Sequence, residues 1–203
     1  WLLGLREAPQ LNFSDVIRLL PIAALNALGH TTTVIAMFQK GGGSFAHVIK
    51  ASEPVVSVLL GVIINANIPR PLTALSLLPI SYGVAYASTL GQLNIETMSK
   101  ELTSTTAVMA MIGNVSFALR SIVRKNLSKE FKERTKLTPA NDHAMTTILS
   151  ACLTIPFIYL YENVHDMEAS YAKINQQEFL LNLFYCGMCF YIYNEVQNMV
   201  LGS

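Results

Sequence analysis

The stretch Ser44–Pro54 reads SFAHVIKASEP and places three ionisable residues, His47, Lys50 and Glu53, in a run that is otherwise apolar. At a rise of about 1.5 Å per residue, a helix over residues 44–66 is long enough to cross a hydrocarbon core of roughly 30 Å. Residues three apart lie on neighbouring positions along one side of a helix, so we expect these groups to face a partner helix or a watery cavity rather than lipid. The stretch therefore predicts a solute pathway through a membrane, with Lys50 as its charge.

The composition favours a membrane protein. The chain is 52% hydrophobic and 13% charged, with a mean hydropathy of +0.40, whereas a soluble domain carries about a quarter charged residues. A net charge of +1 provides no basic surface for nucleic acid, so no nucleic-acid partner is expected. No cofactor or metal site is predicted either: Cys186 and Cys189 form a CxxC in an apolar run, but a zinc site needs four ligands. The absence of HExxH, GxSxG and paired acidic motifs in the sequence argues against an enzyme.

We predict one all-α membrane domain over residues 1–203 with six transmembrane helices, at approximately 15–38, 44–66, 72–90, 105–123, 144–161 and 179–201. Short turns rich in glycine or proline, Gln39–Gly43 and Pro69–Pro71, separate the first three spans. Prolines inside the apolar runs, Pro21, Pro54 and Pro79, predict broken helices, which transporters use to build a site at the membrane midplane.

Six crossings sort all but two of the chain's cations unevenly between the two sides of the membrane. One side receives nine of them and the other receives Lys40, Lys100 and Lys173; the nine are Arg6, Arg18, Arg70, Arg124, Lys125, Lys129, Lys132, Arg134 and Lys136. Such a bias is typical of a correct topology. The charged loop Lys125–Lys136 is expected to be a solvated determinant of this topology.

Two further cations, Lys50 and Arg120, are predicted to lie inside the membrane, together with hydrogen-bond donors at His30, Thr33 and Tyr193. Phosphate suits such a set, because it is dianionic near neutral pH and offers several acceptor oxygens to a lysine point charge and an arginine fork. The set predicts a transporter of phosphate or an organic anion.

Most of these residues also have a purely structural explanation. Lys50 and Glu53 are spaced to form an ion pair within one helix. His30 fits a packed bundle histidine, Arg120 fits a side chain that snorkels to the interface, and Tyr193 fits an interfacial aromatic.

At these residues the chain resembles the plastidic phosphate translocators of the drug/metabolite transporter superfamily. The strongest block is GHTTT at Gly29–Thr33 followed by SFAHVIKASEP, which is similar to the family's GHxxT and SFxHxIKAxEP. NVSFALRS at Asn114–Ser121 resembles NxSFxxRS, and FYIYNE at Phe190–Glu195 resembles FYHLYNQ. Three blocks in the family's order and near its spacing are far more specific than any one of them.

The resemblance implies a ten-helix inverted-repeat transporter in a plastid envelope membrane, an antiporter that exchanges inorganic phosphate for triose phosphate, 3-phosphoglycerate or phosphoenolpyruvate. It implies that Lys50 and Arg120 bind the phosphate or carboxylate, while His30, Thr33 and Tyr193 donate hydrogen bonds to it. By the same correspondence, this chain is the central part of the fold, and the family's terminal helices, with a Lys-Arg pair that follows span six, lie outside it.

Two other functions remain open at this point. A nucleotide-sugar carrier of the same superfamily would use similar helices but would need aromatic contacts for a base. Because the chain begins at Trp1 rather than methionine, a truncated, non-transporting membrane fragment is the second alternative.

Overall fold

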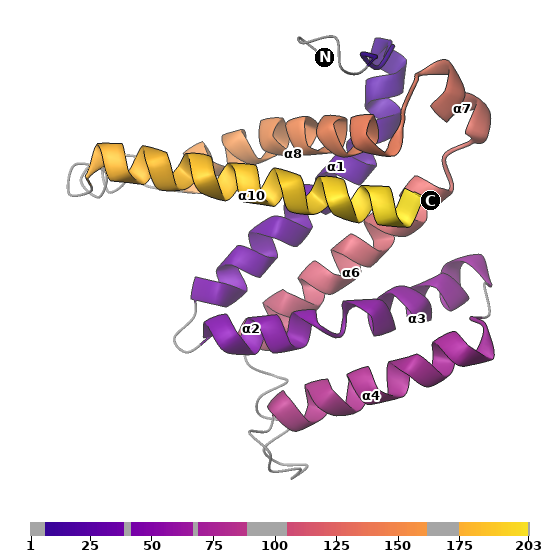
Figure 1. The fold of residues 1–203 in the computed structure, drawn as a ribbon, viewed down its shortest axis with the longest axis vertical. Helices are drawn as coiled ribbons and strands as arrows, with labels where there is room; N and C mark the ends of the chain where they lie inside the picture. Colours follow the sequence, from indigo (N-terminus) through magenta and orange to yellow (C-terminus); the bar gives the residue numbers. More distant parts are fainter. Residues whose placement is uncertain (1–6, 39–41, 67–68, 89–104, 162–174, 203) are drawn as a thin grey trace. The chain divides into compact units, whose positions relative to one another are not determined.

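The computed structural model describes residues 7–38, 42–66, 69–88, 105–161 and 175–202, and these residues form α-helices and no strand (Figure 1). The helices are α1 (Phe13–Phe38), α2 (Gly42–Lys50), α3 (Glu53–Asn65), α4 (Pro71–Ser88), α6 (Thr105–Lys125), α7 (Lys129–Arg134), α8 (Pro139–Tyr161) and α10 (Gln176–Gly202). The predicted all-α class is confirmed. Of the connections between the predicted spans, 91–104 and residues 162–174 of the second, 162–178, lie outside the described residues, whereas residues 176–178 begin α10.

Several of these helices have the length and composition of a membrane span. Within the described ranges, three segments qualify, Phe13–Phe38, Phe45–Asn65 and Thr105–Lys125, and Pro71–Ala87 is a shorter apolar helix. The predicted spans at 144–161 and 179–201 coincide with α8 and α10, and their crossing of the membrane stays a prediction.

The chain divides into two compact units, one of residues 18–127 and one of residues 1–17 with 128–203. We call the first the α1–α6 unit and the second the α7–α10 unit. In the α1–α6 unit, α6 packs against both α2 and α3, and α3 lies beside α4 (Figure 1). Its buried core is built mainly from small residues, which let helix backbones approach closely; the core cluster is Ala36, Ala46, Ile49, Ala107 and Ala110.

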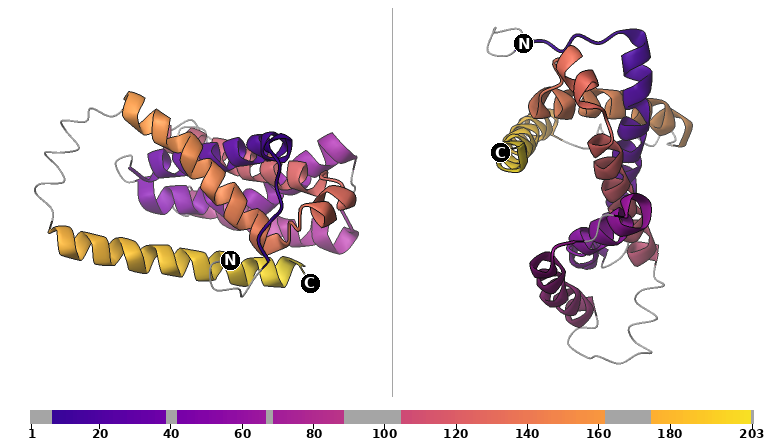
Figure 2. Two further views of the ribbon diagram at one scale, coloured as in Figure 1. Left: turned by 90° about the horizontal axis from the view of Figure 1, so that it is seen from above. Right: turned by 90° about the vertical axis from the view of Figure 1, so that its right-hand side faces the viewer.

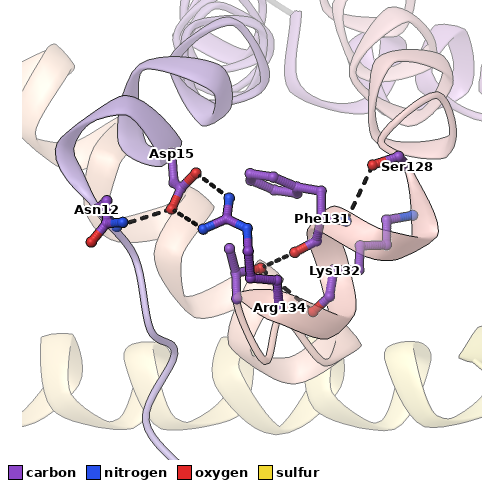
Figure 3. A network of polar contacts seen from close by, with 7 residues as sticks. Asn12, Asp15, Ser128, Phe131, Lys132 and Arg134 are labelled. Carbon is purple, nitrogen blue, oxygen red and sulfur yellow. Dashed lines mark hydrogen bonds and ion pairs between the residues drawn. The ribbon is translucent and has the colours of Figure 1, made fainter.

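In the α7–α10 unit, α8 and α10 contact each other (Figure 2), and a polar network joins the start of the chain to α7 (Figure 3). Asp15 lies in the first turn of α1, where its carboxylate accepts the backbone N–H of Asn12 at 3.0 Å and so caps the helix. The same carboxylate accepts two hydrogen bonds from the guanidinium of Arg134, at 2.6 and 3.1 Å. Asp15 is 3% exposed, so the pair anchors a buried charge.

The loop Lys125–Lys136 is therefore more than the solvated segment that we predicted. Ser128 caps α7 by accepting the backbone N–H of Phe131, which is buried. Lys136 adopts a left-handed conformation (φ 51°), and its ammonium lies 2.9 Å from the carboxylate of Glu7. These contacts fold the loop against the chain's first described residues.

The three prolines expected to break helices behave differently. Pro21 lies within α1 and Pro79 within α4, and both helices continue past them, so that prediction was wrong at these two positions. Only Pro54 stands at a break, which separates α2 from α3 at Ala51 and Ser52. The single helix predicted over residues 44–66 is thus two helices.

Candidate anion-binding site

The ring of Phe117, on α6, lies at the centre of the candidate site. Its side chain is 4% exposed. Three of the predicted site residues lie against the ring: His30 meets it edge-on with the ring centroids 5.0 Å apart, the Nζ of Lys50 is 4.8 Å from the centroid, and the Cζ of Arg120 is 4.9 Å from it. We call His30, Lys50, Phe117 and Arg120 the Phe117 cluster. It lies entirely within the α1–α6 unit.

A glycine on α1 makes room for this ring. A Cβ atom added at Gly29 would lie 2.8 Å from the Cε1 of Phe117, closer than carbon atoms pack in proteins. On α6, Gly113 likewise allows the two helices to lie close together. A Cβ at Gly113 would lie 2.9 Å from the hydroxyl of Thr33 and 3.3 Å from the carbonyl oxygen of Gly29. The α1 and α6 backbones can approach so closely only because both positions lack a side chain.

Lys50 is the last residue of α2, directly before the break. Pro54 has no N–H to donate to the carbonyl of Lys50, and in an unbroken helix its ring would clash with that carbonyl. The chain instead turns at Ala51 and restarts at Ser52, whose carbonyl accepts the backbone N–H groups of Val55 and Val56. The break thus places the ammonium at a helix C-terminus, where the helix dipole favours a positive charge.

Asn114, one turn before Phe117 on α6, forms hydrogen bonds to residues on both sides of the break between α2 and α3. Its Nδ2 donates to the carbonyl oxygen of Ile49 at 2.9 Å and to the hydroxyl of Ser52 at 3.1 Å. Asn114 is 1% exposed, and its Oδ1 has no hydrogen-bond partner within the described part of the chain. The amide therefore fixes the last turn of α2, and with it Lys50, relative to α6.

The Glu53 carboxylate is near enough to attract the Lys50 ammonium electrostatically, but the two side chains form no direct ion pair among the residues that the structure describes. No ion pair joins the two side chains in the described residues, and the break between α2 and α3 lies between them. The structural explanation of Lys50 as half of an intrahelical pair is thus not what the structure contains. The ammonium of Lys50 is half-buried and lies against the Phe117 ring.

Arg120 contacts α1 as well as the Phe117 ring on its own helix. Its Nη1 donates a hydrogen bond to the Oδ1 of Asn26 on α1, and Asn26 is 5% exposed. Together with the contact to Phe117, this bond directs the guanidinium toward α1. Lys50 and Arg120 consequently approach the same ring from α2 and α6.

Thr33 and Tyr193, the other two predicted site residues, are not part of the Phe117 cluster. Thr33 is buried at the α1–α6 crossing, where its hydroxyl donates to the carbonyl oxygen of Gly29 at 2.7 Å. Its hydrogen is therefore directed into its own helix. Tyr193 lies on α10 in the α7–α10 unit and is 64% exposed. Its predicted donor role, like that of Thr33, stays a prediction.

Sequence reasoning missed Phe117, Asn26 and Gly29 as parts of the site. Phe117 and Gly29 both lie within blocks that carry the family resemblance, NVSFALRS and GHTTT. Asn26 had a weaker signal, because it lies one turn before His30 and so shares a face of α1 with it.

Comparison with known proteins supports the family resemblance that these sequence blocks carry. Residues 1–203 match the profile of the Triose-phosphate Transporter family. The chain is 31% identical to the triose phosphate/phosphate translocator, chloroplastic, of Brassica oleracea var. botrytis, in an alignment covering 99% of this chain and 47% of that protein. It is 29% identical to phosphoenolpyruvate/phosphate translocator 1, chloroplastic, of Oryza sativa subsp. japonica, covering 100% of this chain and 47% of the relative. The chain thus spans about half the length of these curated relatives.

Proposed function

Because this chain belongs to the triose-phosphate transporter family, we propose that it supplies the anion-binding cluster of an antiporter that exchanges inorganic phosphate for phosphorylated three-carbon compounds. The protein lies in a plastid envelope membrane, as the chloroplastic relatives and the apolar helices indicate. The expected substrates are triose phosphate, 3-phosphoglycerate and phosphoenolpyruvate. The names of the relatives support phosphate as the common ligand.

One observation carries the proposal: two cations from different helices, Lys50 and Arg120, converge on the buried ring of Phe117. Two positive charges at membrane depth repel each other, and a bound dianion relieves that repulsion. Lysine supplies a point charge and arginine a planar fork, which together suit a phosphate or a carboxylate.

The neighbouring side chains are assigned supporting roles. We propose that His30, on the same ring, donates a hydrogen bond to the ligand, and the same role for Tyr193 stays the prediction made from the sequence. Thr33 can do so only if its hydroxyl rotates away from the carbonyl of Gly29.

The mechanism that follows is strict exchange. With the cluster empty, repulsion between Lys50 and Arg120 opposes closure of the helices around it. A bound dianion favours the occluded state by its higher affinity for that state, and so permits the change of access to the other side. No covalent step is required.

The test replaces Lys50 with glutamine in protein reconstituted into liposomes loaded with phosphate. Losing one charge-assisted hydrogen bond, about 1.5–3 kcal/mol, predicts an increase of about 10- to 100-fold in the phosphate concentration for half-maximal exchange. Lys125→Gln is the matched control, because Lys125 is exposed at the end of α6, and it should exchange at the wild-type rate.

Three results would contradict the proposal. Wild-type exchange by Lys50→Gln rejects the cluster as the binding site. Uptake into empty liposomes at a rate comparable to exchange rejects the antiport mechanism. Competition by nucleotide sugars in place of triose phosphates assigns the protein to the nucleotide-sugar carriers instead.

A further inference from the structure

A buried amide on α1 holds the guanidinium of Arg120. Asn26 is 5% exposed, and its Oδ1 accepts a hydrogen bond from the Nη1 of Arg120, 94 residues away in the sequence. Asn26 precedes Gly29 and His30 by about one helical turn, so the face of α1 that carries it also carries the residues packed on Phe117. The amide and the ring together fix the guanidinium from two directions.

We propose that Asn26 is a positioning residue: its neutral amide holds Arg120 on the Phe117 ring without cancelling the positive charge that the substrate anion needs. The inference rests on the proposed function, since it assumes that Arg120 binds an anion. It extends that function by assigning a second residue, on another helix, to the geometry of the site.

The chemistry of the amide explains why asparagine suits this position. An arginine side chain is long and rotatable, and without a buried acceptor its guanidinium would extend toward the aqueous interface. A carboxylate would hold it more firmly, but an ion pair at this position would neutralise the cation before any substrate arrived. An amide oxygen accepts one of the five guanidinium N–H bonds and adds no charge.

The decisive variant is Asn26→Asp, which keeps the side-chain shape and changes only its charge and hydrogen-bonding character. We expect the introduced carboxylate to pair with Arg120 and to raise the phosphate concentration for half-maximal exchange by about 10- to 100-fold, while the protein stays folded. Asn126→Asp is the matched control, because it adds the same charge at an exposed position after α6. It should leave exchange unchanged.

A double-mutant cycle separates positioning from packing. Asn26→Leu alone should raise the half-maximal phosphate concentration about tenfold, but should add nothing once Arg120 is replaced by glutamine. Additive losses in the cycle, or a wild-type half-maximal concentration for Asn26→Asp, overturn the inference. So does misfolding of Asn26→Asp, because a carboxylate of the same shape should pair with Arg120.

A measurement independent of transport keeps the two proposals distinguishable. Phenylglyoxal modifies arginine guanidinium groups, and mass spectrometry of the Arg120 peptide reports its rate of modification in phosphate-free protein. Asn26→Leu should speed this reaction several-fold, and Asn26→Asp should slow it. If the wild-type protein exchanges no phosphate, the proposed function fails while this labelling still tests Asn26. If exchange is normal but labelling does not change in either variant, only the inference about Asn26 fails.

Discussion

At the scale of single residues, the side chains of Lys50 and Arg120 both lie against one phenylalanine ring. A cation over an aromatic face gains about 0.5–2 kcal/mol, depending on how far it is desolvated. Lys50 and Arg120 both have this contact with Phe117, so the ring offsets part of the cost of keeping two like charges close together. The position of the ring is therefore the most sensitive feature of the site.

Gly29→Ala tests this sensitivity. The added methyl group would lie 2.8 Å from the Phe117 ring, so the ring must move, and with it the contacts of His30, Lys50 and Arg120. We expect a loss of stability of about 1–3 kcal/mol, as for other overpacked cores, with weaker phosphate binding. Thermal unfolding with and without phosphate measures both effects.

Gly61→Ala provides the comparison, because a Cβ at Gly61 on α3 meets nothing within 4 Å. It should bind phosphate as the wild-type protein does. Equal behaviour of the two alanine variants would mean that the position of Phe117 has no influence on the site.

The sequence points to the charged members of the candidate site but not to the residues that contact them. Lys50 and Arg120 stand out because charges are rare in apolar runs. Phe117 carries no such signal, since a phenylalanine is ordinary in a membrane helix. The hydrogen bond from Thr33 to Gly29 depends on the local helix backbone, which residue type does not reveal.

At the scale of helices, the break between α2 and α3 brings Lys50 to a helix end. Three prolines predicted breaks, and only Pro54 has one. Its surroundings offer a physical reason. The carbonyl oxygen of Ile49, in the last turn of α2, accepts hydrogen bonds from the hydroxyl of Ser52 and from the amide of Asn114 on α6. A tertiary partner of this kind cannot be read from the proline alone.

Pro54→Ala should favour a continuous helix. Alanine restores an N–H that can donate to the carbonyl of Lys50 and removes the clash of the proline ring with it. We expect unchanged or higher thermal stability but exchange slower by about 10- to 100-fold, because the ammonium would leave its position on Phe117. Liposome exchange and thermal unfolding of the same preparations measure both.

Pro79→Ala is the matched substitution, because Pro79 lies inside the uninterrupted helix α4. It should leave exchange at the wild-type rate. Normal exchange by Pro54→Ala would show that the break does not place Lys50 for binding.

At the scale of the molecule, ion pairs and a hydrogen bond join residues 7–15 to residues 134–136, which lie just before α8. Arg134 binds Asp15, Lys136 binds Glu7, and the backbone N–H of Gln10 donates to the carbonyl oxygen of Thr135 at 2.9 Å. The all-α class and the approximate helix ranges could be predicted from apolar runs and turn residues. These contacts could not be predicted from the sequence, because they join residues more than a hundred positions apart.

Asp15→Asn should weaken the contact between α1 and Arg134 and so increase trypsin cleavage after Arg134 and Lys136. The hydrogen bond to Asp15 raises the pKa of Arg134 above its ordinary value. A cation with a raised pKa contributes its full stabilisation at every pH below its unfolded pKa, which for arginine lies far above pH 9. The difference in cleavage between wild type and variant should therefore be the same at pH 7 and at pH 9.

Glu7→Gln is the comparison for this prediction. Glu7 is 76% exposed in its pair with Lys136, so water screens that interaction and its removal should change cleavage little. Cleavage that rises equally in both variants, or that rises in Asp15→Asn only at the higher pH, would contradict the role given to the buried carboxylate.

The interruption at Ala51 and Ser52 also bears on how such a protein can move within lipid. Bending a continuous helix in hydrocarbon strips backbone groups of their partners, and each exposed group costs several kcal/mol. Here the backbone ladder is already open, and the amide of Asn114 bridges the gap. A change in the angle between α2 and α3 would break both hydrogen bonds of Asn114 and repack the two helices on α6, but it would open no further backbone hydrogen bonds at the break.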